Sequence, residues 1–215
     1  MGPVALAMSK PLKKTEDKKV MPFVYYNFVR WFFLKLVKIV RRQGISMSTN
    51  QPYSPAHELE QNCEIDFGLL LEAIAQTHGI FAAVSFLNGM STHHCTGLYR
   101  VDGDILTNLR VHDRQAPQLD HLPPLPLRET YCEMVVHTQA PVVIGDALLE
   151  AQLDQHPNRE NIRSYAGVPI AGQGGRTWGT VCHFDAIAQG VHPHDVTRLK
   201  FFAEMVERTE LLTAA

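Results

Sequence analysis

Two β-prone runs, at residues 96–101 and 105–111, are separated by Asp102-Gly103, and this hairpin signal constrains the fold more than any other feature. A second pair of β-prone runs, at residues 163–171 and 177–184, lies on either side of a glycine-rich loop. Hairpin loops join antiparallel strands, whereas parallel strands need long crossover connections. The pattern therefore predicts an antiparallel sheet and not a doubly wound parallel one.

The remaining elements follow from apolar periodicity and from the positions of glycine and proline. Apolar residues at helical spacing lead up to His78, and Gly79 is expected to end this first helix. Two more helices and two more strands are predicted: helices at 127–137 and 194–212, and strands at 80–87 and 141–144, with Asn88-Gly89 as a turn and the proline-rich segment 117–126 irregular. The predicted fold class is α+β, with helices on one face of a six-stranded antiparallel sheet.

The first 46 residues differ in character from the rest. They carry ten Lys or Arg against two acidic residues (+8), while the remainder carries ten against twenty (−10), which gives the net charge of −2. In residues 20–42 the basic side chains share one helical stripe with aromatic residues opposite, a pattern typical of a helix at a membrane surface. Alternatively, residues 1–46 are an over-extended reading frame before Met47. Function is therefore argued from Met47, with residues 47–62 as a leader and 63–212 as one domain.

Composition narrows the function classes. An acidic domain argues against nucleic acid as a partner, because phosphate contacts need clustered positive charge. The four cysteines form no C-x-x-C pair, and a chain of this size needs no disulfide, so we expect reduced thiols in a cytoplasmic protein: Cys63, Cys95, Cys132 and Cys182. The histidine-rich segments 93–95 and 192–194 complete no standard metal-ligand spacing. No metal and no cofactor are expected.

Three segments together resemble the GAF domain family, in sequence, order and spacing: LRETYCEMVVHTQAPVVIGDA (127–147), RSYAGVPI (163–170) and WGTVCHFD (178–185). The resemblance covers about two-thirds of the chain and leaves out residues 1–60. It implies a ligand pocket on one face of the sheet, roofed by the helix at 127–137, and a homodimer through the first and last helices. It also implies that the protein senses an unknown small molecule and transmits a signal, and that it is not an enzyme.

A catalytic alternative stays open. Free methionine-(R)-sulfoxide reductases also resemble this chain in fold, and they place a cysteine where Cys132 stands. If the chain were such a reductase, Cys132 and Cys182 would be its catalytic thiols. Segment 156–161 lacks the further cysteine of that family, however, and Tyr165 stands where the family has an acidic residue. A third possibility is an interaction module whose pocket is filled by side chains near Phe86, Tyr99 and Tyr165.

Polar residues at strand ends and at the start of the roof helix are the candidates for ligand contact, because binding groups concentrate on loops held by a rigid sheet. Free amides at the start of the roof helix would favour an anionic ligand group. The candidate residues are Tyr99, Arg110, Asp113, Glu129, Thr130, Cys132, Asp146, Tyr165 and Cys182. Two other interpretations of Cys132 and Cys182 are that they form a redox-sensing pair or, more simply, that they are small buried apolar residues.

Overall fold

The structure is a computed structural model that describes residues 55–119 and 121–209, leaving out the side chains of residues 55–66 and 173. The predictions for residues 1–46 and for residues 47–54 of the leader lie outside this range. The helices are α2 (Pro55–His78), α3 (Ile80–Gly89), α4 (Cys132–Thr138) and α5 (Pro193–Glu207). The strands are β1 (Cys95–Asp102), β2 (Ile105–Asp113), β3 (Leu125–Pro126), β4 (Val142–Ile144), β5 (Ser164–Ala171) and β6 (Thr177–Asp185).

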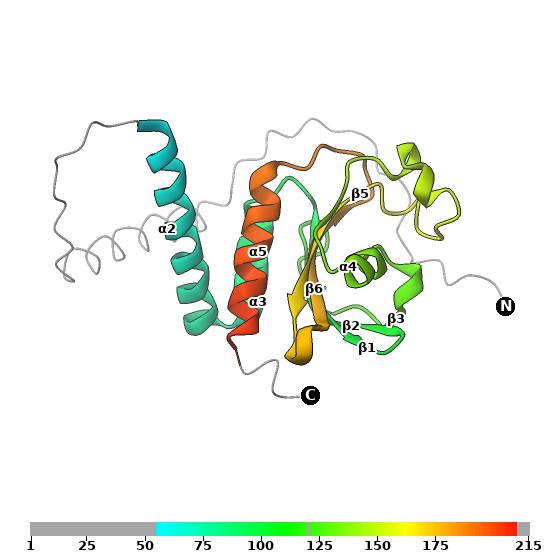
Figure 1. The fold of residues 1–215 in the computed structure, drawn as a ribbon, viewed down its shortest axis with the longest axis horizontal. Helices are drawn as coiled ribbons and strands as arrows, with labels where there is room; N and C mark the ends of the chain where they lie inside the picture. The colour runs from blue at the N-terminus through cyan, green and yellow to red at the C-terminus, as the bar shows by residue number, and fades with distance from the viewer. Residues whose placement is uncertain (1–54, 120, 210–215) are drawn as a thin grey trace. The chain divides into compact units, whose positions relative to one another are not determined.

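The six strands form one antiparallel sheet in the order β3-β2-β1-β6-β5-β4, which confirms the predicted α+β fold class (Figure 1). The β1–β2 hairpin turns at Gly103, whose φ of 61° is accessible to glycine at little cost. The β5–β6 hairpin turns through the expected glycines, two of which also have positive φ. As a result, β6 lies in the middle of the sheet between β1 and β5.

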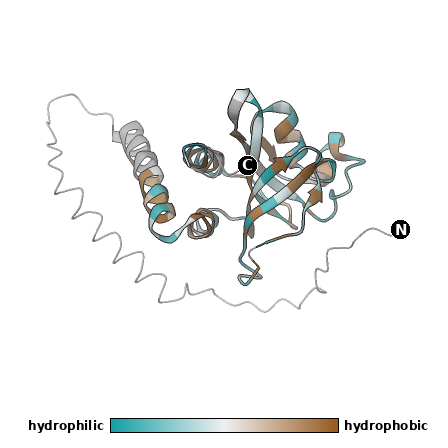
Figure 2. Cartoon of the chain, turned by 90° about the horizontal axis from the view of Figure 1, so that it is seen from below, coloured by the Kyte–Doolittle hydropathy of each residue, from teal (hydrophilic) through white to brown (hydrophobic). Residues whose placement is uncertain are grey.

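Helices cover the two faces of the sheet unequally. Helices α3 and α5 pack on one face, α2 packs against both of them, and α4 lies on the opposite face (Figure 1). The first core cluster joins Leu98, Val168 and Val181 of the sheet to Leu199 and Phe202 of α5. The second cluster fills the space between the sheet and α4. Figure 2 shows the apolar segments of both layers in brown.

The prediction of a strand at residues 80–87 is wrong, because this segment is helix α3. Its residues form a short continuous apolar run, and such a run has no periodicity that separates a buried strand from a buried helix. Ala83, Val84 and Leu87 share one helical face and are buried against the sheet. The expected turn at Asn88-Gly89 is instead the last part of this helix, where Asn88 is buried.

The sixth strand lies in the proline-rich segment that was expected to be irregular. Leu125 and Pro126 pair with Leu106 and Ile105 at the edge of the sheet. Proline cannot donate a hydrogen bond to a neighbouring strand, so an edge position is where a strand tolerates it. The predicted number of strands is therefore right, although one of the six was placed in the wrong segment.

The helix boundaries follow local signals. Gly79, with φ of 84°, ends α2 as expected, and its amide donates to the carbonyl of Ala75. Helix α5 begins at Pro193 after a capping box between His192 and Asp195. The predicted end of this helix at residue 212 lies outside the described residues. Within residues 55–119 and 121–209, no helix is both long enough and apolar enough to cross a membrane.

Candidate functional site

Cys182 lies at the centre of the sheet, on the face covered by α4. Its neighbours across the two adjoining strands are both glycines, Gly97 of β1 and Gly167 of β5. A Cβ atom at Gly97 would overlap the ring of Tyr99, and one at Gly167 would overlap the hydroxyl of Tyr165. The two glycines therefore make room for two tyrosines that lie over the sheet on either side of Cys182.

Cys132, the first residue of α4, packs onto the face of the sheet that carries Cys182 and the two tyrosines. The Tyr165 hydroxyl donates a hydrogen bond to its Sγ across 3.4 Å. Cys182 and the hydroxyls of Thr180 and Thr130 are also close enough to Cys132 to act on its ionisation. Cys132 and Cys182 are 3% and 1% exposed, and both are free thiols. The helix and the sheet thus place two thiols in the same buried cluster.

The two thiols affect each other's ionisation in opposite directions. Hydrogen bonding from Cys182 is the main cause that lowers the pKa of Cys132, and the hydroxyls of Thr180, Tyr165 and Thr130 add to it against the effect of burial. Burial, followed by the neighbouring Cys132, raises the pKa of Cys182. The pair therefore loses its first proton readily and holds its second one tightly, with the charge centred on Cys132.

The polar groups around this pair are uncharged. Burial raises the pKa of both Tyr99 and Tyr165, so that both phenols remain protonated hydrogen-bond donors. Thr180 is fully buried, and within the described part of the chain its Oγ1 has no partner of good hydrogen-bond geometry, although it favours the Cys132 thiolate. A buried polar atom without a partner costs free energy, so a ligand that hydrogen-bonds to Oγ1 of Thr180 would stabilise the fold. We refer to Cys132, Cys182, Tyr99, Tyr165 and Thr180 as the dithiol site.

The sequence profile of the GAF domain matches residues 56–209, which is most of the chain. The chain belongs to the GAF domain family. Solved structures agree on the fold at identities too low to indicate function.

Three of those structures show the range of proteins that share the fold. Free methionine-R-sulfoxide reductase from Neisseria meningitidis, in complex with its substrate, superposes with a TM-score of 0.55 at 16% identity, covering 76% of this chain and 95% of that one. The GAF domain of Acinetobacter phosphoenolpyruvate-protein phosphotransferase gives 0.54 at 14%, covering 70% and 96%. The phycocyanobilin-bound GAF domain of a cyanobacterial phytochrome gives 0.54 at 12%, covering 69% and 96%. No curated protein sequence matches the chain.

Five of the nine predicted site residues come together in this GAF domain. Tyr99, Cys132, Tyr165 and Cys182 belong to the second core cluster, and Thr130 lies next to Cys132 while its hydroxyl donates to the carbonyl of Leu127. Cys132 and Cys182 are predicted as a pair from the sequence, and the structure adds Tyr99, Thr130 and Tyr165 to the same group. The fold brings them together because β1, β5 and β6 are adjacent and α4 crosses over them.

The four charged candidates lie elsewhere, and the side chains of Arg110, Asp113 and Asp146 have local partners. Arg110 donates to His121 and to a backbone carbonyl, and Asp113 accepts from the amide of Gln115. Asp146 caps the short helix at Ala147–Leu149 and forms two hydrogen bonds with Arg163, at 2.9 and 2.8 Å. The prediction that Glu129 and Thr130 begin the roof helix is wrong, because α4 begins at Cys132; Glu129 ends a 3-10 turn before it, and its backbone carbonyl accepts from Asn158.

Three features of the site were missed in the sequence, namely Gly97, Gly167 and the unpartnered Thr180. The glycines do leave a signal, because Gly97-Leu-Tyr99 and Tyr165-Ala-Gly167 are mirror images of each other. A glycine inside a strand pattern often marks the close approach of another group. Phe86 had been grouped with this pocket, but it stacks on Phe67 in the helical layer, with ring centroids 5.8 Å apart.

A second buried polar cluster lies on the helical face of the sheet. His93 stacks on His183 with ring centroids 5.9 Å apart, and His183 shares a 2.7 Å hydrogen bond with Thr96. His94 turns away to pair with Asp185 at 2.7 Å. Burial lowers the pKa of His93 and brings that of His183 to about 3, so both rings are neutral at pH 7. Within the described residues, no three potential metal-binding side chains gather in one place.

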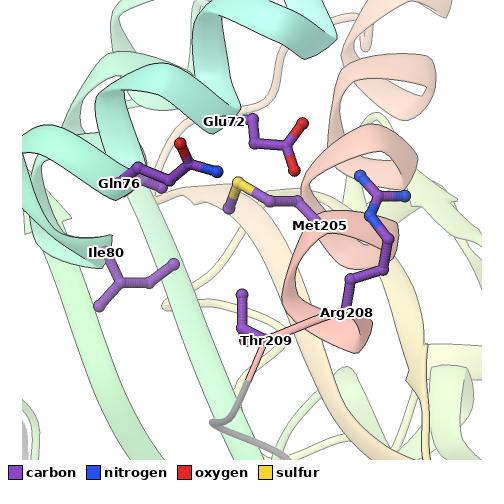
Figure 3. Close-up of a pocket in the computed structure, with 7 residues that line it drawn as sticks. Glu72, Gln76, Ile80, Met205, Arg208 and Thr209 are labelled. Carbon is purple, nitrogen blue, oxygen red and sulfur yellow. The ribbon is translucent and has the colours of Figure 1, made fainter.

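A groove of about 440 Å³ lies between α2 and α5 (Figure 3). It is lined by Glu72, Ala75, Gln76, Ile80, Met205, Arg208 and Thr209. Leu69 is 59% exposed and lies one helical turn before Glu72, on the same side of α2. This face of the helical layer therefore combines a groove with an exposed apolar residue.

Proposed function

We propose that this GAF domain is a sensor whose input is a small, uncharged molecule bound at the dithiol site beneath α4. The observation that carries the proposal is the unpartnered Oγ1 of Thr180, fully buried among two thiols and two phenols. Buried polar groups without partners are costly, and they are commonly found where a structure serves binding or catalysis. A ligand that accepts or donates one hydrogen bond at Thr180 would remove that cost.

The chemistry of the site argues for an uncharged ligand. The groups with the largest influence on Cys132 are one thiol and three hydroxyls, none of which carries a charge at neutral pH. The side chains of three charged candidates have partners away from the site: Arg110 bonds to His121, Asp113 to the amide of Gln115 and Asp146 to Arg163. A buried anionic ligand would lack a counter-charge there and would be repelled by the Cys132 thiolate, and burying an unpaired charge costs several kcal/mol or more.

The output would pass through β5 to the helical layer. Tyr165 of β5 faces α4. Ala166 and Val168 of the same strand point to the opposite face of the sheet and pack into the cluster that contains α5. A ligand that prefers one position of Tyr165 therefore biases the packing of α5. We propose that two copies associate through α2 and α5, where Leu69 and the groove lie. A reducing compartment such as the cytoplasm would keep both thiols reduced.

Thermal denaturation of the full chain tests this function. The panel contains small amides, ketones and sulfoxides, with cyclic nucleotides and inorganic anions as a charged comparison set. An uncharged ligand at 100 times its Kd should stabilise the fold by about 2.7 kcal/mol, or roughly 5–10 °C for a domain of this size. The matched variant is Thr180→Val, which keeps the side-chain shape but removes the unpartnered hydroxyl. The proposal fails if charged compounds alone stabilise the protein, or if Thr180→Val responds like the parent.

A thiol oxidoreductase is the second candidate, favoured by the contact between Cys132 and Cys182. Reduction of a sulfoxide needs an attacking thiolate and a resolving thiol within reach, and this pair supplies both. Segment 156–161 has no cysteine; its His156 ring packs on Tyr131 with centroids 4.4 Å apart. If the protein reduces free methionine sulfoxide with a thiol donor, and Cys132→Ser loses this activity, the protein is a reductase and not a sensor.

The interaction module is the third candidate, and the burial of Tyr99 and Tyr165, at 6% and 2% exposure, favours it. If the two rings fill the pocket permanently, no ligand can enter. The thermal panel separates this case from the other two, because an interaction module would gain stability from none of the compounds and would turn over no sulfoxide.

A further inference from the structure

We propose that Cys132 and Cys182 form a reversible disulfide on exposure to a peroxide, so that the dithiol site is also a redox switch. The inference rests on the proposed sensor function for its biological purpose, while its chemistry rests on the position and surroundings of the two thiols. It gives the site a second input, which is an oxidant in place of a bound ligand.

The two thiols are positioned for this bond. Cys132 and Cys182 belong to the same buried cluster, and the Tyr165 hydroxyl, which lies over Gly167 next to Cys182, is 3.4 Å from the Sγ of Cys132. A disulfide needs the two sulfur atoms about 2 Å apart, so one of the two side chains has to move toward the other. Cys182 is fixed in the middle of the sheet between β1 and β5. Cys132 begins a helix of seven residues that follows a 3-10 turn, so α4 is the side that moves.

The surroundings assign a different role to each sulfur. Cys132 accepts a hydrogen bond from the Tyr165 hydroxyl, and this bond and the nearby Cys182 favour its thiolate, which is the nucleophile. The Cys132 thiolate attacks one oxygen of the peroxide and displaces hydroxide, which takes up a proton to leave as water, and Cys132 becomes a sulfenic acid. The Cys182 sulfur then attacks the sulfenic sulfur, and a second water leaves as the disulfide forms. Two thiols and one hydrogen peroxide thus give one disulfide and two waters.

The structure also provides selectivity. Both sulfurs are almost completely buried, so a reagent the size of hydrogen peroxide reaches them more readily than a bulky disulfide. Cys95 is buried too, but burial and the nearby Asp113 carboxylate raise its pKa, and it keeps its thiol protonated. Cys95 is therefore not expected to react with peroxide as Cys132 does.

Disulfide formation would change the surface above the sheet. The residue before Cys132 is Tyr131, whose hydroxyl donates to the carbonyl of Ile162, 3.0 Å away, just before β5 begins. A shift of α4 toward β6 therefore pulls on the start of β5. The switch acts on the same strand that carries Tyr165 and packs against α5.

The test uses the full chain with Cys63→Ser and Cys95→Ser, so that the pair is the only source of thiols. Treatment with hydrogen peroxide should lower the intact mass by about 2 Da, remove both titratable thiols and link the peptides of Cys132 and Cys182, and dithiothreitol should reverse all three changes. With Cys182→Ser added, the reaction should stop at a sulfenic acid on Cys132 that dimedone traps. With Cys132→Ser instead, peroxide consumption should fall to the rate of an unactivated thiol.

The inference is overturned if the parent gains about 32 Da as a sulfinic acid without any linked peptide, or if both thiols survive peroxide that oxidises free cysteine at the same pH. These outcomes leave the ligand panel untouched, because that panel is run under reducing conditions. A disulfide without any stabilising ligand would keep the switch and remove the ligand-sensing function. A stabilising ligand without a disulfide would keep the ligand-sensing function and remove the redox switch.

Discussion

The Tyr165 hydroxyl donates a hydrogen bond to Sγ of Cys132 across 3.4 Å, and so joins the middle of the sheet to the first residue of α4. Tyr165 can reach this position because Gly167, two residues along the same strand, has no side chain. One glycine, one tyrosine and one cysteine thus determine how the roof helix sits over the sheet. The consequences of this arrangement can be measured separately.

Tyr165→Phe should slow the alkylation of Cys132. The variant removes a hydrogen bond that favours the thiolate, so the pKa of Cys132 should rise. One hydrogen bond of about 0.5–1.5 kcal/mol corresponds to a roughly two- to tenfold lower rate at pH 7. Iodoacetamide kinetics in the Cys63→Ser, Cys95→Ser background provide the measurement. Tyr131→Phe is the control, since its hydroxyl donates to Ile162; equal rates in both variants would contradict the assigned role.

Gly167→Ala should destabilise the domain by about 1–3 kcal/mol, because the new methyl group overlaps the Tyr165 hydroxyl and forces that side chain to move. Urea denaturation monitored by circular dichroism gives the difference in unfolding free energy. Gly190→Ala is the matched control: a Cβ there meets nothing within 4 Å, and the change should stay within about 0.5 kcal/mol. An unaltered midpoint in Gly167→Ala would show that Tyr165 does not need this space.

Stability should fall as the pH decreases from 6.5 toward 3. The pKa of His183 is about 3 in the folded state and 6.5 in the reference state, mainly because burial disfavours the cation, with His93, Arg114 and Arg198 adding positive potential. Between these values the unfolded chain binds a proton that the folded chain does not. Unfolding free energy should therefore rise with pH by up to about 1.4 kcal/mol per pH unit from this residue.

The slope of unfolding free energy against pH is the measurement for this histidine. His183→Asn should reduce the slope whatever its effect on absolute stability, whereas the exposed His137→Asn should leave it unchanged. A slope between pH 4 and 6 that is equal in all three proteins would place the pH sensitivity elsewhere.

Leu69→Glu should weaken self-association if two copies meet through α2 and α5. The side chain is 59% exposed beside the groove, and two glutamates at a two-fold interface would repel each other and add desolvation cost. Sedimentation velocity over a range of concentrations measures the dimer dissociation constant. Leu149→Glu is the control, because Leu149 is 82% exposed but lies on the opposite layer. A monomeric parent, or equal effects of both variants, would exclude this interface.

Local patterns predicted most of the fold. The Asp102-Gly103 turn, the stop at Gly79 and the alternation in the strands act over a few residues, so they can be read without knowledge of the rest of the chain. Residues 80–87 could not be assigned in this way. Whether a short apolar run becomes a strand or a helix depends on the surface that buries it, and here that surface is the sheet formed by segments far along the chain.

The residue types of the site could be recognised in the sequence, but the pairing register of the strands decides which of these residues come together. Polar and reactive residues such as Cys132, Cys182, Tyr99 and Tyr165 are conspicuous in the sequence, and all four share the dithiol site. Charged residues such as Arg110 and Asp146 are just as conspicuous, but the structure gives them local partners. Residue type cannot distinguish the two sets, because long-range contacts decide which of these side chains come together in the site and which have local partners.

The sequence alone thus determined an antiparallel α+β domain, its turns, and a short set of residues able to carry chemistry. Only the tertiary structure decided that Cys182 lies between Gly97 and Gly167, that two tyrosines lie over those glycines, and that Cys132 meets Cys182 beneath α4. The physical reason is distance along the chain. Turns and helix ends depend on the conformational preferences of neighbouring residues, whereas the contact of the two thiols depends on strand pairings and packing between residues fifty positions apart.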